Sequence, residues 1–289
     1  MKQRIFPVIV LLLVSAIHAS ALDRHHVFGI VLKVSSPKTF VVSCKEIPGY
    51  MEAMVMSFTV REAKELDALR PGMMVDFTLV EDEGSSYAEN VTIHKYQSTE
   101  QEPQEVERLK LFQGLTAPHA SDDLIAVNQH VPDFTLVDQN RQTVQLSQFA
   151  GKVVVISFFY TKCPYSNYCF RLSNNLGVVR QRFADRLGKD LVLLSVTFDP
   201  VFDRPEVLAK YAGTWKTGPT GWYFLTGQPA EIRRVCGMFG TNVWNDEGLL
   251  SHTMHTVVIN RNGDLVSNLE GNEFTAEQLG NFLQTVMEN

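Results

Sequence analysis

The hydrophobic pattern divides the chain into two regions. Between Val27 and Tyr96, short apolar runs with alternating polar positions predict five strands, separated by turn-forming residues. Five strands within about seventy residues predict a small all-β, OB-like barrel, closed or nearly closed. The predicted strands cover residues 27–34, 39–44, 54–60, 73–81 and 87–96.

The second region alternates fully apolar runs with runs at helical spacing. Residues 153–160 and 191–198 are almost wholly apolar, which is typical of strands covered on both faces. Shorter strands and several helices follow, and this order predicts an α/β domain in which helices sandwich a mixed sheet. Strands are predicted at 222–225, 256–259 and 264–268, and helices at 172–187, 205–212, 230–239 and 275–287.

Polar, acidic sequence separates the two regions and sets the predicted boundaries. We expect a β domain at 22–97, a linker at 98–125 and an α/β domain at 126–289. Residues 1–21 differ, because two basic residues precede an apolar run at 5–17 that ends in small residues. This pattern is typical of a cleaved export signal. The alternative is an uncleaved segment that anchors the protein in the inner membrane through residues 5–17.

Composition and charge narrow the function. With 289 residues, 45% of them hydrophobic, the chain can bury a substantial core. A net charge of -6 gives no support for a nucleic-acid partner. Thiols of an exported protein oxidise unless they form disulfides, bind metal or are kept reduced. Each of the four cysteines therefore needs one of these explanations.

Cys163 and Cys169 lie where the strand at 153–160 runs into a helix. The positive end of a helix favours the thiolate, which is both a nucleophile and a soft metal ligand. The five residues between the cysteines include Pro164 and allow the loop to fold back. Both a disulfide and a shared metal are therefore open.

An imidazole could complete this site. His252 precedes the strand at 256–259, and two thiolates with one imidazole suit copper, or zinc if a fourth ligand is added. His255 is the rival candidate. Asp199, at the end of a buried strand, either orients a ligand or caps the following turn.

Three methionines fall within six residues of the β region. Met54 and Met56 point to one face of a strand, and Met51 lies at the preceding turn. Thioethers that face together are suited to copper(I). The alternative is that these flexible side chains fill gaps in the core.

Residues 131–289 resemble the Sco/SenC family of thioredoxin-like copper proteins, which serve cytochrome c oxidase assembly. The resemblance implies a thioredoxin-like fold, with copper(I) or copper(II) bound by Cys163, Cys169 and His252. The commonest family pattern has three residues between the cysteines, whereas this chain has five. The matching segments are Val131-Pro132-Asp133-Phe134, Phe158 to Pro164, Ser195 to Pro200 with Asp203 to Leu208, and His252-Thr253 before Gly263.

Residues 27–96 resemble small periplasmic copper-binding barrels of the CusF type, in which a histidine, a tryptophan and two methionines hold copper(I). Met54 and Met56 match the Met-x-Met-x-Phe segment of these barrels. Met51 stands at about the place of the tryptophan, and Cys44 at about that of the histidine. The resemblance implies a copper(I) site made by these four residues. A small buried hydrophobe is the alternative for Cys44 and the preferred interpretation of Cys236.

Together these features predict an exported, periplasmic metallochaperone that delivers copper, or maintains target cysteines, for oxidase assembly. The expected partner is a copper-receiving or thiol-bearing protein such as an oxidase subunit, with membrane contact only through an uncleaved N-terminal segment. One alternative is a thiol-disulfide oxidoreductase that uses Cys163 and Cys169 as its redox pair, so enzymatic activity stays open. The other is a periplasmic copper-buffering or resistance protein.

Overall fold

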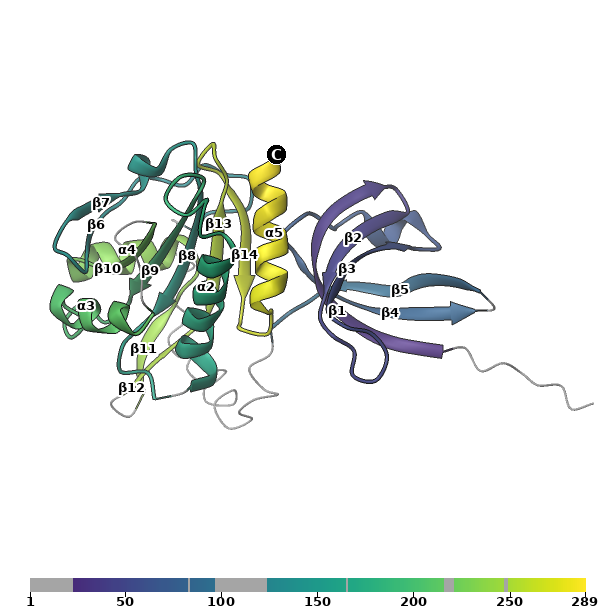
Figure 1. Cartoon of the computed structure of the whole chain (residues 1–289), viewed down its shortest axis with the longest axis horizontal. Coiled ribbons are helices and arrows are strands. Elements are labelled where there is room, and N and C mark those ends of the chain that lie inside the picture. Colours follow the sequence, from purple (N-terminus) through teal and green to yellow (C-terminus); the bar gives the residue numbers. More distant parts are fainter. Residues whose placement is uncertain (1–22, 83, 97–123, 165, 216–220, 247–248) are drawn as a thin grey trace, which may run out of the picture.

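The structure is a computed structural model that describes residues 23–82, 84–96, 124–164, 166–215, 221–246 and 249–289. Figure 1 shows an all-β domain beside a larger α/β domain. The predicted signal segment, residues 1–21, and nearly all of the predicted linker, residues 98–125, lie outside the described residues.

The N-terminal domain is one antiparallel sheet with the strand order β3-β2-β1-β4-β5, and all five predicted strands are present. Alternate residues point into an apolar core around Phe40, Phe58 and Phe77, whose rings contact one another. The elements are β1 (Asp23–Ser36), β2 (Thr39–Cys44), β3 (Met54–Thr59), the 3₁₀ helix η1 (Ala63–Leu66), β4 (Met74–Asp82) and β5 (Ser85–Ile93).

The sheet is not closed, so of the two expectations the fully closed barrel is wrong. Between the described parts of its two edges we find a single bridge, which joins Val60, just after β3, to Ala88 of β5. The pairing of β5 with β4 shifts register between Asp76 and Thr78, and Asn90 of β5 has a φ of 56°. An irregular edge strand of this kind does not offer a straight ladder for closure.

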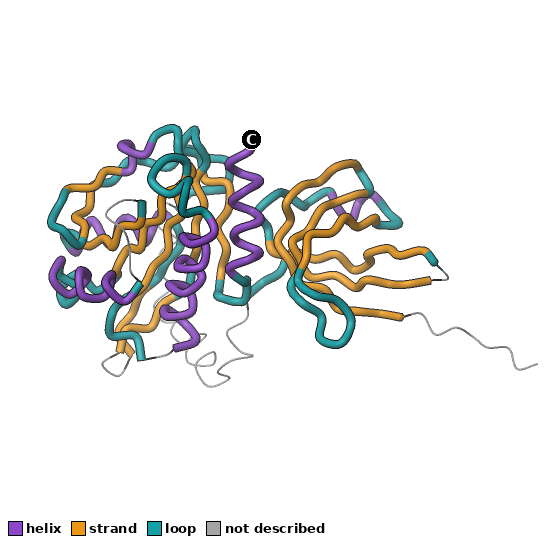
Figure 2. Tube along the Cα trace, viewed as in Figure 1, coloured by secondary structure: helices purple, strands orange, loops and turns teal. Residues whose placement is uncertain are grey.

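The C-terminal domain is built on a seven-stranded mixed sheet with the order β14-β13-β8-β9-β10-β6-β7. The central strands β8 and β9 are parallel, and every residue in both is buried, as the apolar runs predict. Helix α2 packs against α5, whereas α3 contacts β10 and β6 (Figure 2). The strands are β6 (Thr135–Asp138), β7 (Thr143–Gln145), β8 (Val153–Phe159), β9 (Leu191–Thr197), β10 (Trp222–Thr226), β13 (His255–Ile259) and β14 (Leu265–Glu270). The helices are η3 (Leu146–Phe149), α2 (Arg171–Arg182), α3 (Pro205–Thr214), α4 (Pro229–Met238) and α5 (Ala276–Glu288).

Two hairpins are absent from the sequence prediction. The β6–β7 hairpin extends the main sheet, and β11 (Val243–Asp246) pairs with β12 (Leu249–His252) in a separate two-stranded sheet. Strands of three or four residues are too short for a clear alternating pattern. The second hairpin matters for function because it ends at His252.

The two domains share one apolar core. Ile30, Leu32 and Met74 of the N-terminal domain belong to the same buried cluster as the core of the C-terminal domain. Gly72, with a φ of 84°, allows the backbone to approach closely, because a Cβ atom there would lie 2.6 Å from the Phe282 ring. The domains are therefore docked through a closely packed apolar contact.

An imidazole bridges the same interface. The Nδ1 atom of His94 lies 2.5 Å from a carboxylate oxygen of Asp76, and its Nε2 atom lies 2.6 Å from one of Glu273 in the other domain. Since ionised carboxylates only accept hydrogen bonds, this arrangement favours the imidazolium form of the ring, in which both nitrogens donate. Burial acts to lower the pKa of His94, but the hydrogen bonds and charges of the two carboxylates outweigh it, and the pKa is raised.

We expect this contact to weaken as the pH rises. Because the pKa of His94 is higher in the folded than in the unfolded chain, its contribution to stability is complete below the unfolded value of about 6.5 and is lost as the pH rises through the folded value. His94→Gln, which cannot donate twice from its side chain to two carboxylates in this way, should remove that pH dependence. Thermal unfolding of the full chain from about pH 6 to 9 measures it.

The exposed His130, 3.4 Å from Asp264, supplies the matched control, His130→Gln. Equal slopes of unfolding temperature against pH for wild type and His94→Gln would contradict the prediction.

Candidate metal centre

The cysteine pair lies where β8 ends and α2 begins. Cys169 belongs to a single π-helical turn, η4 (Ser166–Phe170), that runs directly into α2. A π turn places more residues in one turn than an α-helix does, which accommodates the long spacing between the cysteines. Cys169 is 2% exposed, whereas Cys163 is partly exposed. Both are thiols rather than a disulfide.

The structure brings His252 to Cys169. Its Nε2 atom lies 3.7 Å from the Cys169 Sγ atom, and its Nδ1 atom donates to the Thr253 carbonyl oxygen at 2.9 Å. The ring also contacts Phe198, with 4.3 Å between ring centroids. Burial lowers the pKa of His252 to about 4, so the ring is neutral near pH 7. The Nε2 lone pair therefore faces the thiol and is available to a metal.

The separation of these two atoms fits a metal site. Bonds of about 2.3 Å to sulfur and 2.0 Å to nitrogen, as for zinc, place the two donors about 3.5–3.7 Å apart at tetrahedral or trigonal angles. The pKa of Cys169 is raised, first by its hydrogen bond to Cys163 and then by burial. Among the described residues, no three His, Cys, Asp or Glu side chains already form a closed metal site. Cys163, the third predicted ligand, is partly exposed and is hydrogen-bonded to Cys169.

His255, the rival histidine, is occupied elsewhere. Its Nδ1 atom donates to the Asn268 side chain at 2.8 Å, and the amide of Asn268 donates in turn to the Phe239 carbonyl oxygen at 2.9 Å. Burial lowers the pKa of His255. The ring thus ties β13 to β14 and the end of α4, and this geometry favours His252 as the ligand.

Asp203 is a site residue that sequence reasoning missed. Its fully buried carboxylate accepts hydrogen bonds from the backbone and side chain of Thr161, two residues before Cys163, and from Thr197 at 2.6 Å. Burial raises its pKa. Asp199 instead accepts from the backbone of Phe202 and caps the turn. The Asp203 in the Ser195–Leu208 segment was the available signal, but only the fold shows that it anchors the cysteine loop.

The candidate ligands of the N-terminal domain gather at one end of its sheet. Cys44 pairs with Met54 across β2 and β3, so both side chains lie on one face, with Met56 two residues further along. Cys44 is 1% exposed and Met54 is 44% exposed. Met51 and Met56 pack against the same core as Cys44. Burial raises the pKa of Cys44 to about 12, so a metal would have to displace its proton.

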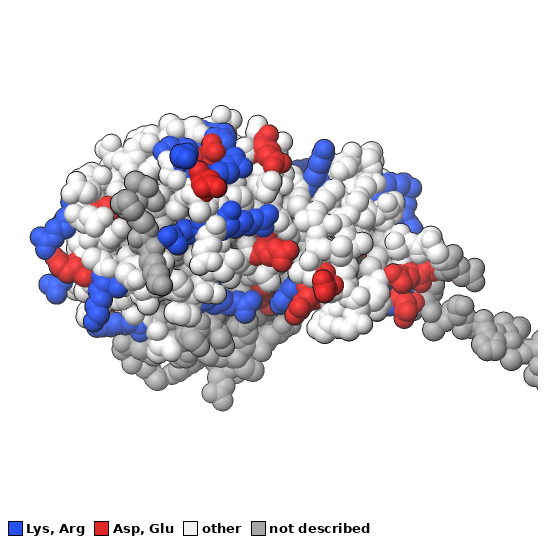
Figure 3. Space-filling view, viewed as in Figure 1, with Lys and Arg blue, Asp and Glu red and all other residues white. Residues whose placement is uncertain are grey.

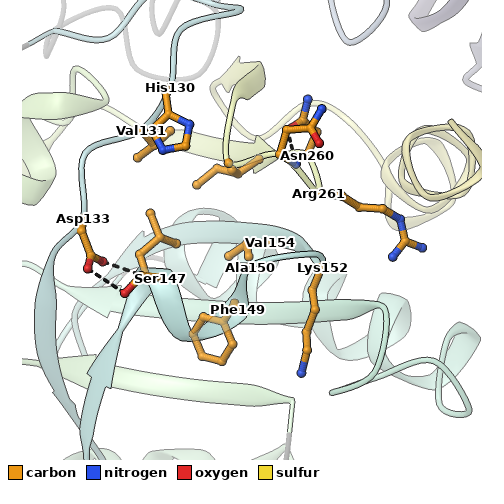
Figure 4. Close-up of a pocket in the computed structure, with 14 residues that line it drawn as sticks. His130, Val131, Asp133, Ser147, Phe149, Ala150, Lys152, Val154, Asn260 and Arg261 are labelled. Carbon is orange, nitrogen blue, oxygen red and sulfur yellow. Dashed lines mark hydrogen bonds between the residues drawn. The ribbon is translucent and has the colours of Figure 1, made fainter.

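A hollow of about 190 Å³ lies between η3 and the β13–β14 turn (Figure 4). Ser147 donates from its hydroxyl and its backbone to Asp133, at 2.7 and 2.9 Å. Lys152 and Arg261 donate to backbone carbonyl oxygens. The predicted ligands do not line this hollow, and its polar groups are engaged, so we assign it no chemistry.

Comparison with known proteins matches both domains. Residues 123–288 match the sequence model of SCO1/SenC. The chain belongs to the SCO1/SenC family. Residues 24–95 match the model of CusF, a copper binding periplasmic protein. Both resemblances and the thioredoxin-like fold of the SCO1/SenC domain are confirmed.

The SCO1/SenC domain has distant relatives. A SCO2-like protein of Rickettsia typhi is 25% identical over 52% of this chain and 74% of its own length. The SCO1 protein homolog of Bacillus subtilis is 28% identical over 35% of this chain and 51% of its own length. Thiol-disulfide oxidoreductase ResA of Geobacillus kaustophilus is 26% identical over 38% of this chain and 69% of its own length.

A solved structure shares the fold of this domain. A protein from Aquifex aeolicus VF5 superposes with a TM-score of 0.50 and 21% identity, over 56% of this chain and 94% of that chain. Arabidopsis thaliana ScoI with copper bound superposes with a TM-score of 0.48 and 20% identity, over 57% of this chain and 100% of that chain.

We expect His252→Ala to weaken copper binding by the SCO1/SenC domain by more than about 100-fold, the upper range for a mere outer-sphere partner. His255→Ala should retain copper but lose about 1–3 kcal/mol of stability, because Asn268 loses its buried partner. Both variants are made in the full chain from which the candidate ligands of the N-terminal domain, Cys44, Met51, Met54 and Met56, have been removed by substitution. Competition with a chelator measures copper affinity, and thermal unfolding measures stability. Loss of copper in His255→Ala alone would mean that the other histidine is the ligand.

Proposed function

We propose that this protein is an exported metallochaperone whose SCO1/SenC domain carries copper as cargo. The placement of His252 carries the proposal, because its hydrogen bond to Thr253 fixes the tautomer and its Nε2 atom faces Cys169 at 3.7 Å. Cys163, Cys169 and His252 would then hold the metal. Two thiolates and a neutral imidazole suit copper(I) and also accept copper(II).

Proton release is part of this binding. His252 is already neutral above about pH 4. Cys169 has a raised pKa and must lose its proton when the metal binds. Cys169 and His252 are thus uncharged in the empty protein, and Cys169 becomes a thiolate only when the cargo binds, which avoids two adjacent thiolates before then.

The CusF-like domain would provide a second copper site. Its proposed ligands are Cys44, Met51, Met54 and Met56, a set rich in sulfur that favours copper(I). Met54 is exposed and Cys44 is buried, so copper would enter at the exposed rim and be drawn toward the core.

Thiol-disulfide exchange is a second candidate function, favoured by the hydrogen bond between Cys169 and Cys163. In this reaction the Cys163 thiolate attacks a target disulfide and releases one target thiolate. Cys169 then loses its proton and attacks Cys163, which releases the second target thiolate and leaves a Cys163–Cys169 disulfide. His252 is not needed for these steps, so its position favours metal binding. A copper buffer would use the same sites without a recipient.

We infer that the protein acts outside the cytoplasm, with an oxidase subunit as the recipient of its copper. Support comes from the export pattern at residues 1–21 and from the periplasmic description of the CusF family. On the face shown in Figure 3, acidic and basic side chains are mixed. Within the described residues, the helices are too short or too polar to cross a membrane.

Metal analysis and redox titration together test the proposal. The purified, reduced protein should hold copper tightly through the SCO1/SenC domain, and its Cys163–Cys169 couple should have a low reduction potential. A readily reduced disulfide without copper would favour thiol exchange instead.

We expect the CusF-like domain to prefer copper(I) over copper(II) and zinc, because thioethers are poor ligands for harder ions. The full chain with Cys163→Ser and Cys169→Ser isolates this site for competition with a copper(I) chelator. Adding Met54→Leu and Met56→Leu should weaken binding at least about tenfold. Met238→Leu, in the buried face of α4, is the matched control. Unchanged affinity would show that the two methionines only pack the core.

We expect copper to pass from the CusF-like domain to the SCO1/SenC domain, because two thiolates with an imidazole bind copper(I) more strongly than thioethers do. A copper-loaded chain with Cys163→Ser and Cys169→Ser is mixed with a reduced, metal-free chain that lacks the N-terminal ligands. After separation by an affinity tag, the metal should be on the second chain. If the copper stays on the first chain, the predicted direction of transfer is wrong.

A further inference from the structure

Helix α5 of the SCO1/SenC domain holds the CusF-like domain beside its proposed ligand Cys44. Gln278, which is fully buried, donates from Nε2 to the Ser43 carbonyl oxygen at 3.0 Å. Asn281, about one turn further along α5, donates from Nδ2 to the Ser43 hydroxyl at 2.9 Å. Both hydrogen bonds therefore converge on the residue that precedes Cys44 in β2.

The geometry of β2 passes this restraint on to Cys44. Successive side chains of a strand point to opposite faces, so Ser43 points to α5 while Cys44 points into the core of the CusF-like domain. Gly29 of β1 lies opposite Cys44, and a Cβ atom at Gly29 would lie 2.7 Å from the Ser43 carbonyl oxygen. The strand end is thus held by α5 and closely approached by β1.

Gln278 is itself held in one orientation. Its Oε1 atom accepts from the Thr275 backbone at 2.9 Å, and its own backbone donates to the Thr275 hydroxyl at 3.1 Å. This capping box starts α5 and leaves the Nε2 group of Gln278 to point at Ser43. The donor is therefore already oriented.

We propose that Gln278 and Asn281 are positioning residues for the copper(I) site of the CusF-like domain, acting through Ser43 on Cys44. The inference rests on the proposed function, in which Cys44 is a ligand. The other proposed ligands come from β3 and the turn before it, so the site needs the end of β2 at a fixed place. Copper retention in one domain then depends on docking against the other.

The test uses the full chain with Cys163→Ser and Cys169→Ser, and measures copper(I) affinity by competition with a chelator. Gln278→Leu keeps a similar volume but loses the donor, and should weaken binding about tenfold, the scale of one buried hydrogen bond. Ser43→Ala removes the hydroxyl that accepts the hydrogen bond from Asn281. In a chain that already carries Ser43→Ala, Asn281→Ala should therefore have little further effect on copper affinity.

Two measurements separate positioning from general destabilisation. Gln284→Leu, on the exposed face of α5, is the matched control and should leave the affinity unchanged. X-ray absorption of the bound copper should show fewer sulfur neighbours in Gln278→Leu than in the parent chain, because Cys44 leaves while the thioethers stay. Thermal unfolding confirms that each variant is folded.

The outcomes are distinct. Unchanged affinity in folded Gln278→Leu and Ser43→Ala, while Cys44→Ala still weakens binding, would overturn the positioning role and leave the ligand set intact. Unchanged affinity in Cys44→Ala would overturn the ligand assignment and the inference with it. Should Gln278→Leu fail to fold, Gln278→Glu keeps the oxygen that accepts from Thr275 but loses the Nε2 donor, and it tests Gln278 in its place, while Ser43→Ala tests Asn281.

Discussion

The buried parallel pair β8–β9 determines where the chemistry of the SCO1/SenC domain can lie. Both strands are covered on both faces, so their side chains are mostly apolar, and reactive groups follow where the strands end. The last paired residues are Phe159 and Thr197, at one edge of the sheet. The cysteine loop follows β8 and the Asp203 turn follows β9. Asp203 then ties the two segments together through Thr161 and Thr197.

Burial, more than charge, prepares the two candidate sites. The Cys169 thiol is kept protonated by its hydrogen bond to Cys163 and by burial, and His252 is kept neutral by burial. The Cys44 thiol is also protonated because it lies in an apolar core. Each site therefore begins without a buried unpaired charge, which would be costly. At the proposed sites, a soft cation would supply the positive charge that the deprotonated thiols then balance.

Docking makes the two domains one structural unit. Ile30, Leu32 and Met74 would be exposed if the domains were separated, so isolated fragments would differ from the full chain. Hydrogen bonds fix the relative orientation of the two domains within this apolar contact, since His94 and Gln278 each bond to a defined partner in the other domain. The candidate site of the CusF-like domain therefore cannot be described fully without helix α5 of the other domain.

Local sequence predicted much of this structure, because periodicity and motif spacing are properties of short segments. It predicted the strands of the N-terminal domain, the buried strands β8 and β9, and the family segments around Cys163. The pattern could not show that the β sheet stays open, since closure depends on the match between two distant edges. The hairpin that ends at His252 was likewise too short to predict.

The family resemblance already favoured His252 over His255, and the tertiary structure adds the physical reason, whereas only the tertiary structure distinguished Asp203 from Asp199. In each pair both residues are chemically suitable, and the difference lies in which partner the fold places beside them. His252 faces Cys169 from 83 positions away, whereas His255 bonds to Asn268. The contact between Gln278 and Ser43 spans 235 positions. Sequence determined which residues could do the chemistry, and long-range packing decided which ones meet, because hydrogen bonds and metal sites require atoms within a few ångströms.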